Sequence, residues 1–190
     1  MYSMKKIMMI AALMLMSVGA FAQEAGKFAI GANAGIAAYG NEYNPFGIGA
    51  KAQYSITENF RAEAAFNYWF PKNDAGIMDF DLNLQYLIPI VDKLYIYPLV
   101  GANLGMTHGD AFKVIFDKQQ TIFGLQGGAG IEYFLTDNVK ANFDIKYQYN
   151  KKTESTSTTY NGNTYSSEYE MKYDGPVFQV GIAYVFWLRY

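Results

Sequence analysis

The sequence contains few side chains of the kinds that catalyse reactions, and they are isolated from one another. His108 is the single histidine and cysteine is absent, which excludes thiolate nucleophiles and thiolate metal ligands. His108 stands in the segment Thr107-His108-Gly109-Asp110, which supplies no serine for the imidazole to activate. Because catalysis of this type needs a nucleophile within hydrogen-bond reach of the base, we predict that the protein is not an enzyme.

Two further patterns are typical of binding sites but fit other roles better. Asp79 and Asp81 would share one face of a strand and suit a cation, although nearby lysine and arginine make ion pairing the expected role. Gly127-Gly128-Ala129-Gly130 has the composition of a phosphate-binding loop, but it falls within a predicted strand and no helix follows. We therefore predict no metal site and no cofactor.

The segments that carry these residues are predicted to be strands, because apolar residues recur at every second position. In the clearest run, 78–88, the apolar even positions alternate with Asp79, Asp81, Asn83, Gln85 and Leu87. A helix would scatter the apolar residues around its circumference, whereas a strand separates them onto one face. Eight such runs are predicted, at 27–38, 47–56, 60–70, 78–88, 94–106, 121–135, 139–149 and 178–190.

The connections between these strands alternate in length. The turns at 57–59, 89–93 and 136–138 are short, and the remaining connections are longer, up to the hydrophilic segment 151–176. The residues 54–62 also resemble 133–141, which indicates that one hairpin is used twice, as in an up-and-down meander. Outer-membrane barrels have short periplasmic turns and longer external loops. The fold class predicted is therefore all-β, an eight-stranded antiparallel up-and-down transmembrane β-barrel.

The apolar face of these strands is too bulky to lie inside an eight-stranded barrel. Such a barrel encloses little more than its own lining side chains, and here the apolar face carries many phenylalanine and tyrosine rings. We therefore expect the rings to face lipid, with tyrosines near the strand ends forming girdles at Tyr54, Tyr68, Tyr86, Tyr133 and Tyr149. A soluble periplasmic binder of the lipocalin type, with the apolar face inward, is the alternative.

The polar face then lines the lumen and carries charges of both signs. Buried carboxylates and cations are tolerated when they pair with one another. We predict a salt-bridged plug, with a narrow diffusion channel as the alternative, formed by Lys51, Arg61, Glu63, Asp79, Asp81, Glu132, Lys140, Asp144 and Lys146.

The first 22 residues have the three parts of a secretory signal. Lys5 and Lys6 precede the apolar run 7–16, and Ala20-Phe21-Ala22 provides small residues before a cleavage site after Ala22. The barrel domain is expected to comprise residues 23–190 and to reach the outer membrane through the periplasm. A net charge of −2 gives no reason to expect a nucleic-acid partner.

The hydrophilic segment before the last strand is the best candidate for a functional surface. Asn161-Gly162 at its centre is a strong signal for a two-residue hairpin, so the flanking strands should continue outward as a ribbon. Exposed ribbon edges and tyrosine-rich surfaces are suited to binding other molecules. We predict that the protein has a structural role or an adhesion or surface-recognition role. The candidate recognition residues are Tyr160, Asn161, Gly162, Tyr165 and Tyr169, with a shielding loop as the alternative.

The strand pattern, the small size and the aromatic last strand resemble the OmpA/OmpX-like outer-membrane barrels, including the porin-like outer membrane protein beta-barrel domain group. The residues 94–105, Leu-Tyr-Ile-Tyr-Pro-Leu-Val-Gly-Ala-Asn-Leu-Gly, are similar to a strand of that group, and 178–190 to its closing strand. Members of the family usually finish on Phe, whereas this chain ends on Tyr190. The resemblance implies an assembly signal read by the barrel assembly machinery at Phe178, Val180, Ile182, Tyr184, Phe186 and Tyr190.

The resemblance also implies partners and one further alternative. The expected partners are outer-membrane lipids and lipopolysaccharide, together with an unidentified surface ligand, for a protein expected to be a monomer. Some barrels of this size modify lipid A with a His and a Ser at the outer rim. The segment around His108 lacks that Ser, so a lipid A-modifying enzyme is kept only as an alternative.

Overall fold

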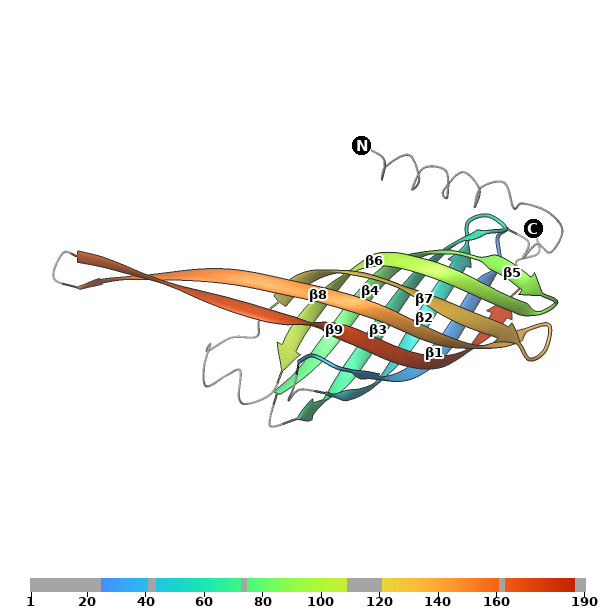
Figure 1. Cartoon of the computed structure of the whole chain (residues 1–190), viewed down its shortest axis with the longest axis horizontal. Coiled ribbons are helices and arrows are strands. Elements are labelled where there is room, and N and C mark those ends of the chain that lie inside the picture. Colours follow the sequence, from blue (N-terminus) through green and yellow to red (C-terminus); the bar gives the residue numbers. More distant parts are fainter. Residues whose placement is uncertain (1–24, 41–43, 73–74, 109–120, 161–162, 187–190) are drawn as a thin grey trace, which may run out of the picture.

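The computed structural model shows a slender barrel from which two strands project as a long ribbon (Figure 1). It describes residues 25–40, 44–72, 75–108, 121–160 and 163–186, with side chains described except at 72, 75, 108 and 154–171. The strands are β1 Phe28–Ala37, β2 Phe46–Ser55, β3 Phe60–Lys72, β4 Ala75–Tyr86, β5 Ile88–Val91, β6 Leu94–His108, β7 Thr121–Phe134, β8 Val139–Tyr160 and β9 Asn163–Phe186.

Eight of these strands close into one antiparallel barrel. The hydrogen-bonded order is β4-β3-β2-β1-β9-β8-β7-β6-β5, and a further pairing of β4 with β6 closes the ring. The first and last strands, β1 and β9, meet in continuous register from Phe28 opposite Phe186 to Ala37 opposite Val177. The predicted eight-stranded up-and-down barrel is confirmed.

The predicted turn at 89–93 is partly wrong, because a short ninth strand occupies most of it. After a break at Leu87, β5 continues along β6, with Ile88 opposite Ile96 and Val91 opposite Leu94. β5 is at the end of the strand order, and among the described strands it pairs only with β6. Pro89 has no backbone N–H to donate, and on this edge strand no second neighbouring strand requires one. The turn itself narrows to Asp92 and Lys93, and Lys93 adopts the left-handed backbone conformation with φ 65°.

The repeated hairpin predicted from the sequence has the same geometry in both copies. The Thr57 hydroxyl accepts from the amides of Asn59 and Phe60 at 3.3 and 3.0 Å, and the Thr136 hydroxyl accepts from the two equivalent amides at the same distances. In each copy the asparagine side chain donates to a backbone carbonyl of another strand segment at 3.0 Å, from Asn59 to Leu87 and from Asn138 to Val185. Each turn is therefore tied to a segment beyond its own hairpin.

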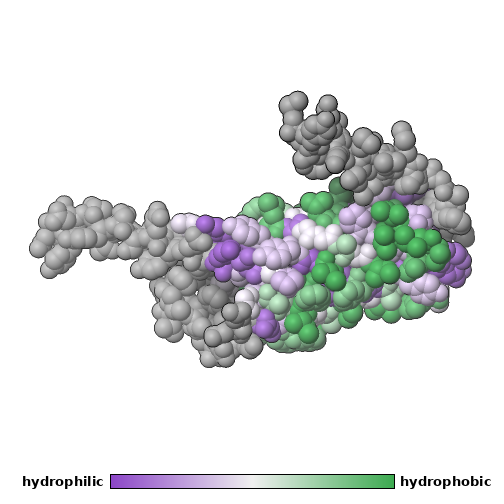
Figure 2. Space-filling model, viewed as in Figure 1, coloured by the Kyte–Doolittle hydropathy of each residue, from purple (hydrophilic) through white to green (hydrophobic). Residues whose placement is uncertain are grey.

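The apolar face points outward, as predicted. Leu82, Val100 and Leu125 are 59–68% exposed, and rings such as Phe80 and Phe123 are 48–58% exposed. Figure 2 shows apolar residues covering much of the visible wall of the barrel, with hydrophilic residues gathered where the ribbon begins and at the opposite end. Among the described residues, no helix has the length and apolar character needed to cross a membrane.

The ribbon consists of the outer parts of β8 and β9. Pairing of β8 with β7 ends at Asn150, and pairing of β9 with β1 ends at Val177. The two strands nevertheless stay in unbroken register with each other out to Tyr160 opposite Asn163. They therefore run well past the rim of the barrel (Figure 1), and both are longer than the sequence runs 139–149 and 178–190 indicated.

Candidate functional site

The lumen is lined by polar side chains from strands all around the barrel. The nine charged residues predicted to line it are all buried, with at most 7% of any residue exposed: Lys51, Arg61, Glu63, Asp79, Asp81, Glu132, Lys140, Asp144 and Lys146. They point inward because they occupy alternate positions whose neighbours carry the apolar outer face. They form three groups along the barrel.

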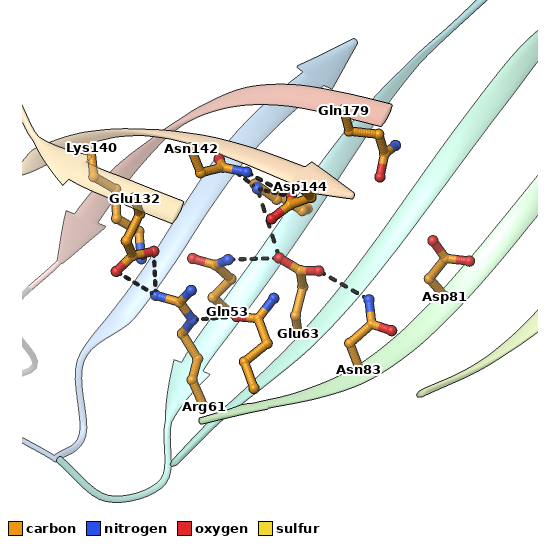
Figure 3. Close-up of polar contacts among 12 residues, drawn as sticks. Gln53, Arg61, Glu63, Asp81, Asn83, Glu132, Lys140, Asn142, Asp144 and Gln179 are labelled. Atoms are coloured by element: carbon orange, nitrogen blue, oxygen red, sulfur yellow. Dashed lines mark hydrogen bonds and ion pairs between the residues drawn. The ribbon is translucent and has the colours of Figure 1, made fainter. Parts of the chain in front are cut away.

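The first group surrounds Glu132 near the short-turn end. Arg61 Nη1 lies 2.8 Å from Glu132 Oε2, and Lys140 Nζ lies 3.2 Å from the same oxygen (Figure 3). Arg61 Nε also donates to Gln85 Oε1 at 2.6 Å, and the guanidinium carbon is 5.1 Å from the centroid of the Tyr97 ring. One carboxylate therefore holds two cations from two other strands.

The second group centres on Lys51. Its Nζ lies 3.8 Å from Glu63 Oε2 and 3.9 Å from Asp144 Oδ2, and it donates to Asn142 Oδ1 at 2.8 Å. Neighbouring amides complete the coordination of the carboxylates, with Gln53 and Asn83 donating to Glu63 at 2.6 and 3.1 Å. The cation thus joins β2 to β3 on one side and to β8 on the other.

The third group lies closer to the ribbon end. Lys146 Nζ is 2.5 Å from Asp81 Oδ2, which also accepts from Asn67 at 3.0 Å. Asp79 accepts from the indole of Trp69 at 2.8 Å and takes part in no ion pair among the described residues. In the part of the chain whose side chains are described, the buried charged residues thus number five carboxylates and four cations.

Amide side chains fill the space between these groups. Gln148 donates to Gln126 at 2.9 Å, and Gln126 donates in turn to Asn83 at 2.6 Å. Gln179 of the last strand donates to Asn67 across the lumen at 3.0 Å. Many of the buried polar side chains are thus linked to one another across the interior, which stabilises a polar interior. Six buried side-chain atoms among the described residues have no hydrogen-bond partner, one each on Asn33, Gln53, Arg61, Asp79, Asp81 and Gln85.

Small residues make room for this network. A side chain at Gly130 would collide with the ring of Tyr97 and with the carboxylate of Asp144. Tyr97 uses that space to donate a hydrogen bond from its hydroxyl to Asp144. The glycines on the inward face of the strands are therefore part of the packing of the lumen.

Sequence reasoning missed the apolar clusters that cover each end of the polar network. At the ribbon end, Trp69 packs with Ala37, Tyr39, Ile77 and Val177. At the short-turn end, one cluster contains Ala29, Phe134, Ala183 and Val185, and a second contains Leu87, Tyr97 and Leu99. The signal available in the sequence was the presence of Trp69, Leu87 and Val185 at inward positions near strand ends.

The other predicted site residues lie apart from the lumen. On β9, the proposed assembly signal is on the outer surface, where Phe178, Val180, Ile182, Tyr184 and Phe186 are 40–57% exposed, while Tyr190 lies outside the described residues. Of the proposed recognition residues, Tyr160, Tyr165 and Tyr169 are in the ribbon strands, and Asn161 and Gly162 lie outside the described residues. His108 is the last residue of β6.

The described residues offer no arrangement suited to metal catalysis. No group of three or more histidines and carboxylates among them is placed to hold a metal ion. The lumen carboxylates instead bind lysine, arginine and amide side chains and, at Asp79, the Trp69 indole. That the protein is not an enzyme remains a prediction.

The sequence profile of the outer membrane protein beta-barrel domain matches residues 8–186. The chain belongs to this family. An outer membrane location follows from the membership, and the soluble lipocalin-like alternative is set aside because the barrel turns its apolar face outward. No curated protein matches the chain.

Solved outer membrane barrels share the fold at low sequence identity. Neisserial surface protein A aligns with a TM-score of 0.61 at 16% identity, over 84% of this chain and 96% of its own. The N-terminal barrel domain of Pseudomonas aeruginosa OprF gives 0.57 at 16% identity, over 86% and 100%. OprG from the same organism gives 0.56 at 18% identity, over 87% and 98%. At these identities the likeness establishes the fold alone.

Proposed function

We propose that this outer membrane barrel acts through its protruding ribbon, which serves as an adhesion or surface-recognition element, while its lumen is a structural plug. The observation that carries the proposal is the unbroken pairing of β8 with β9 beyond the barrel, out to Tyr160 opposite Asn163. A loop that only covered the mouth of the barrel would have no need of regular pairing over this length.

The ribbon has the form that suits strand addition. From Thr153 and Glu170 outward, each strand pairs only with the other among the described residues, so each carries a second edge of backbone donors and acceptors. Such edges bind extended segments of other proteins through backbone hydrogen bonds. The partner class we propose is therefore a protein at or beyond the cell surface that offers an exposed strand.

The lumen supports the second part of the proposal. Eight of its nine charged residues form ion pairs with one another, and apolar clusters cover both ends. Barrels of eight strands have interiors just wide enough for their own side chains, whereas conducting porins have about twice as many strands. In planar bilayers we therefore expect no steady single-channel conductance, and a reproducible conductance would favour the narrow-channel alternative.

The register allows the ribbon to be shortened without disturbing the barrel. Thr153 lies opposite Glu170, so replacing residues 154–169 by Asn-Gly joins a cross-strand pair through a two-residue turn. A matched intermediate replaces residues 157–166 in the same way, between Thr156 and Ser167. Both variants keep every residue that pairs with β7 or β1.

The test compares binding of the three proteins in outer membrane vesicles to immobilised extracellular matrix proteins. We expect the full-length barrel to bind, the intermediate to bind less, and the short variant to lose binding, while all three keep the gel mobility shift on heating that marks a folded barrel. Equal binding by all three would refute the recognition role, as would absence of binding by the full-length protein. Unchanged lipid A, measured by mass spectrometry of producing cells, is expected in each case.

A further inference from the structure

One hollow part of the outward wall is lined by several alanines. Two adjoining hollows of about 560 and 630 Å³ lie along β1, β2, β3, β4 and β6. They share Ala52, Ala64 and Leu82, so they form one continuous depression, which we name the alanine groove. Its floor consists of Ala50, Ala52, Ala62 and Ala64, of which Ala50 and Ala64 are exposed and the others half-buried.

The strand register explains the shape of the alanine groove. Ala52 lies opposite Ala64, and Ala50 lies opposite Ala32 on the other side of β2, so small methyl groups meet across neighbouring strands here. Larger side chains bound the groove on both sides, with Phe28 and Tyr54 towards the short-turn end. At the other end the rings of Phe66 and Phe80 pack with centroids 4.8 Å apart.

The alanine groove is continuous with the lipid-facing surface of the barrel. Its walls include Leu82 and Val100, which are 68% and 64% exposed, and family membership places this surface in the outer membrane. An empty apolar depression in hydrocarbon loses the contacts of the atoms lining it, so an apolar chain from the membrane gains those contacts by lying in it. The occupant therefore has the chemistry of a lipid acyl chain.

The position of the alanine groove along the barrel indicates which leaflet of the outer membrane it faces. It begins beside Tyr54, at the end of the barrel with short turns, which outer-membrane barrels direct to the periplasm. It extends to Ala50 along β2, four residue steps of ~3.3 Å or roughly 13 Å. Because the strands of such barrels tilt by about 35–45°, this corresponds to roughly 10 Å of the ~25 Å height of their apolar belt. We propose that the alanine groove binds one acyl chain of a phospholipid in the periplasmic leaflet.

The test fills the groove without touching the lumen. Ala64→Phe and Ala52→Phe each place a ring where the two hollows meet. Ala129→Phe is the matched control, because Ala129 is exposed on the outward face of β7 and borders neither hollow. The unmodified barrel and the three variants are each placed in nanodiscs of phosphatidylethanolamine and phosphatidylglycerol, with and without added lipopolysaccharide. Native mass spectrometry of the released proteins then identifies the lipid that each one retains.

We expect the unmodified barrel and Ala129→Phe to retain one phospholipid and both groove variants to lose it, with an unchanged heat-dependent gel shift in all four. Equal retention in the four proteins would overturn the proposal, and so would absence of retained lipid in the unmodified barrel. Retention of lipopolysaccharide in place of phospholipid would overturn the assignment to the periplasmic leaflet. None of these outcomes depends on what the ribbon binds.

Discussion

Arg61 Nη1 lies 2.8 Å from Glu132 Oε2, which joins β3 to β7 across the lumen although β4 and β6 separate these strands in the sheet. Both side chains are almost wholly buried. An ion pair of this kind contributes less by its own attraction than it costs to break, because removing one partner leaves a charge in a medium of low polarity.

The cost of breaking this group should depend on which member is removed. Glu132→Gln leaves both Arg61 and Lys140 without their carboxylate and should cost about 3–5 kcal/mol of unfolding free energy. Lys140→Met leaves Glu132 its pair with Arg61 and should cost less. Urea unfolding in lipid vesicles measures both, and an equal loss in the two variants would contradict the shared-carboxylate geometry.

Asp79 and Asp81 should respond differently to the same change. Asp81→Asn leaves Lys146 without an ion partner and is expected to cost about 3–5 kcal/mol. Asp79→Asn removes a carboxylate that has no cationic partner among the described residues and keeps an oxygen for the Trp69 indole, so its effect should stay within about 1 kcal/mol. The comparison uses the same unfolding assay, and a larger loss for Asp79→Asn would be evidence against the pairing of Lys146 with Asp81.

Because the apolar face is assigned to lipid, the loss of stability caused by an arginine on that face should depend on its depth in the membrane. Leu82→Arg, near the middle of β4 and 68% exposed, should destabilise the barrel by about 2–4 kcal/mol or prevent assembly. Ile56→Arg changes an apolar residue that is 51% exposed and lies at a short turn, and it should cost about 0–1 kcal/mol. Folding yield by heat-dependent gel mobility and unfolding in urea distinguish the two, and similar penalties would place this face outside the hydrocarbon.

The repeated turns should be energetically equivalent. Asn59→Ala and Asn138→Ala each remove one side-chain hydrogen bond to a backbone carbonyl and should each cost about 1 kcal/mol. The two turns share no partners, so the double variant should show the sum of the single effects. A single variant whose loss differed several-fold from the other would mean that the two turns do not serve the same role.

Several features of the barrel could be read from the order of residues. Alternation along 78–88 predicted a strand with Asp79 and Asp81 on one face, and the repetition of Thr57-Glu58-Asn59 as Thr136-Asp137-Asn138 predicted two equal hairpins. Both readings depend on local geometry, because neighbouring side chains on a strand always point to opposite faces. The excess of rings on one face settled which side faces outward, since volume alone excludes them from a small barrel.

The sequence by itself determined the two-residue period of apolar side chains, the number of strands in the barrel and the face that each residue occupies. These properties follow from rules that act over a few residues. Only the tertiary structure decided which charges meet, such as Arg61 with Glu132 and Lys146 with Asp81, because those pairs depend on the stagger between strands far apart in the chain. The same holds for the short strand β5, whose pairing with β6 exists only once the barrel has closed. It holds also for the alanine groove, since Ala52 and Ala64 become neighbours through a register that no single strand encodes.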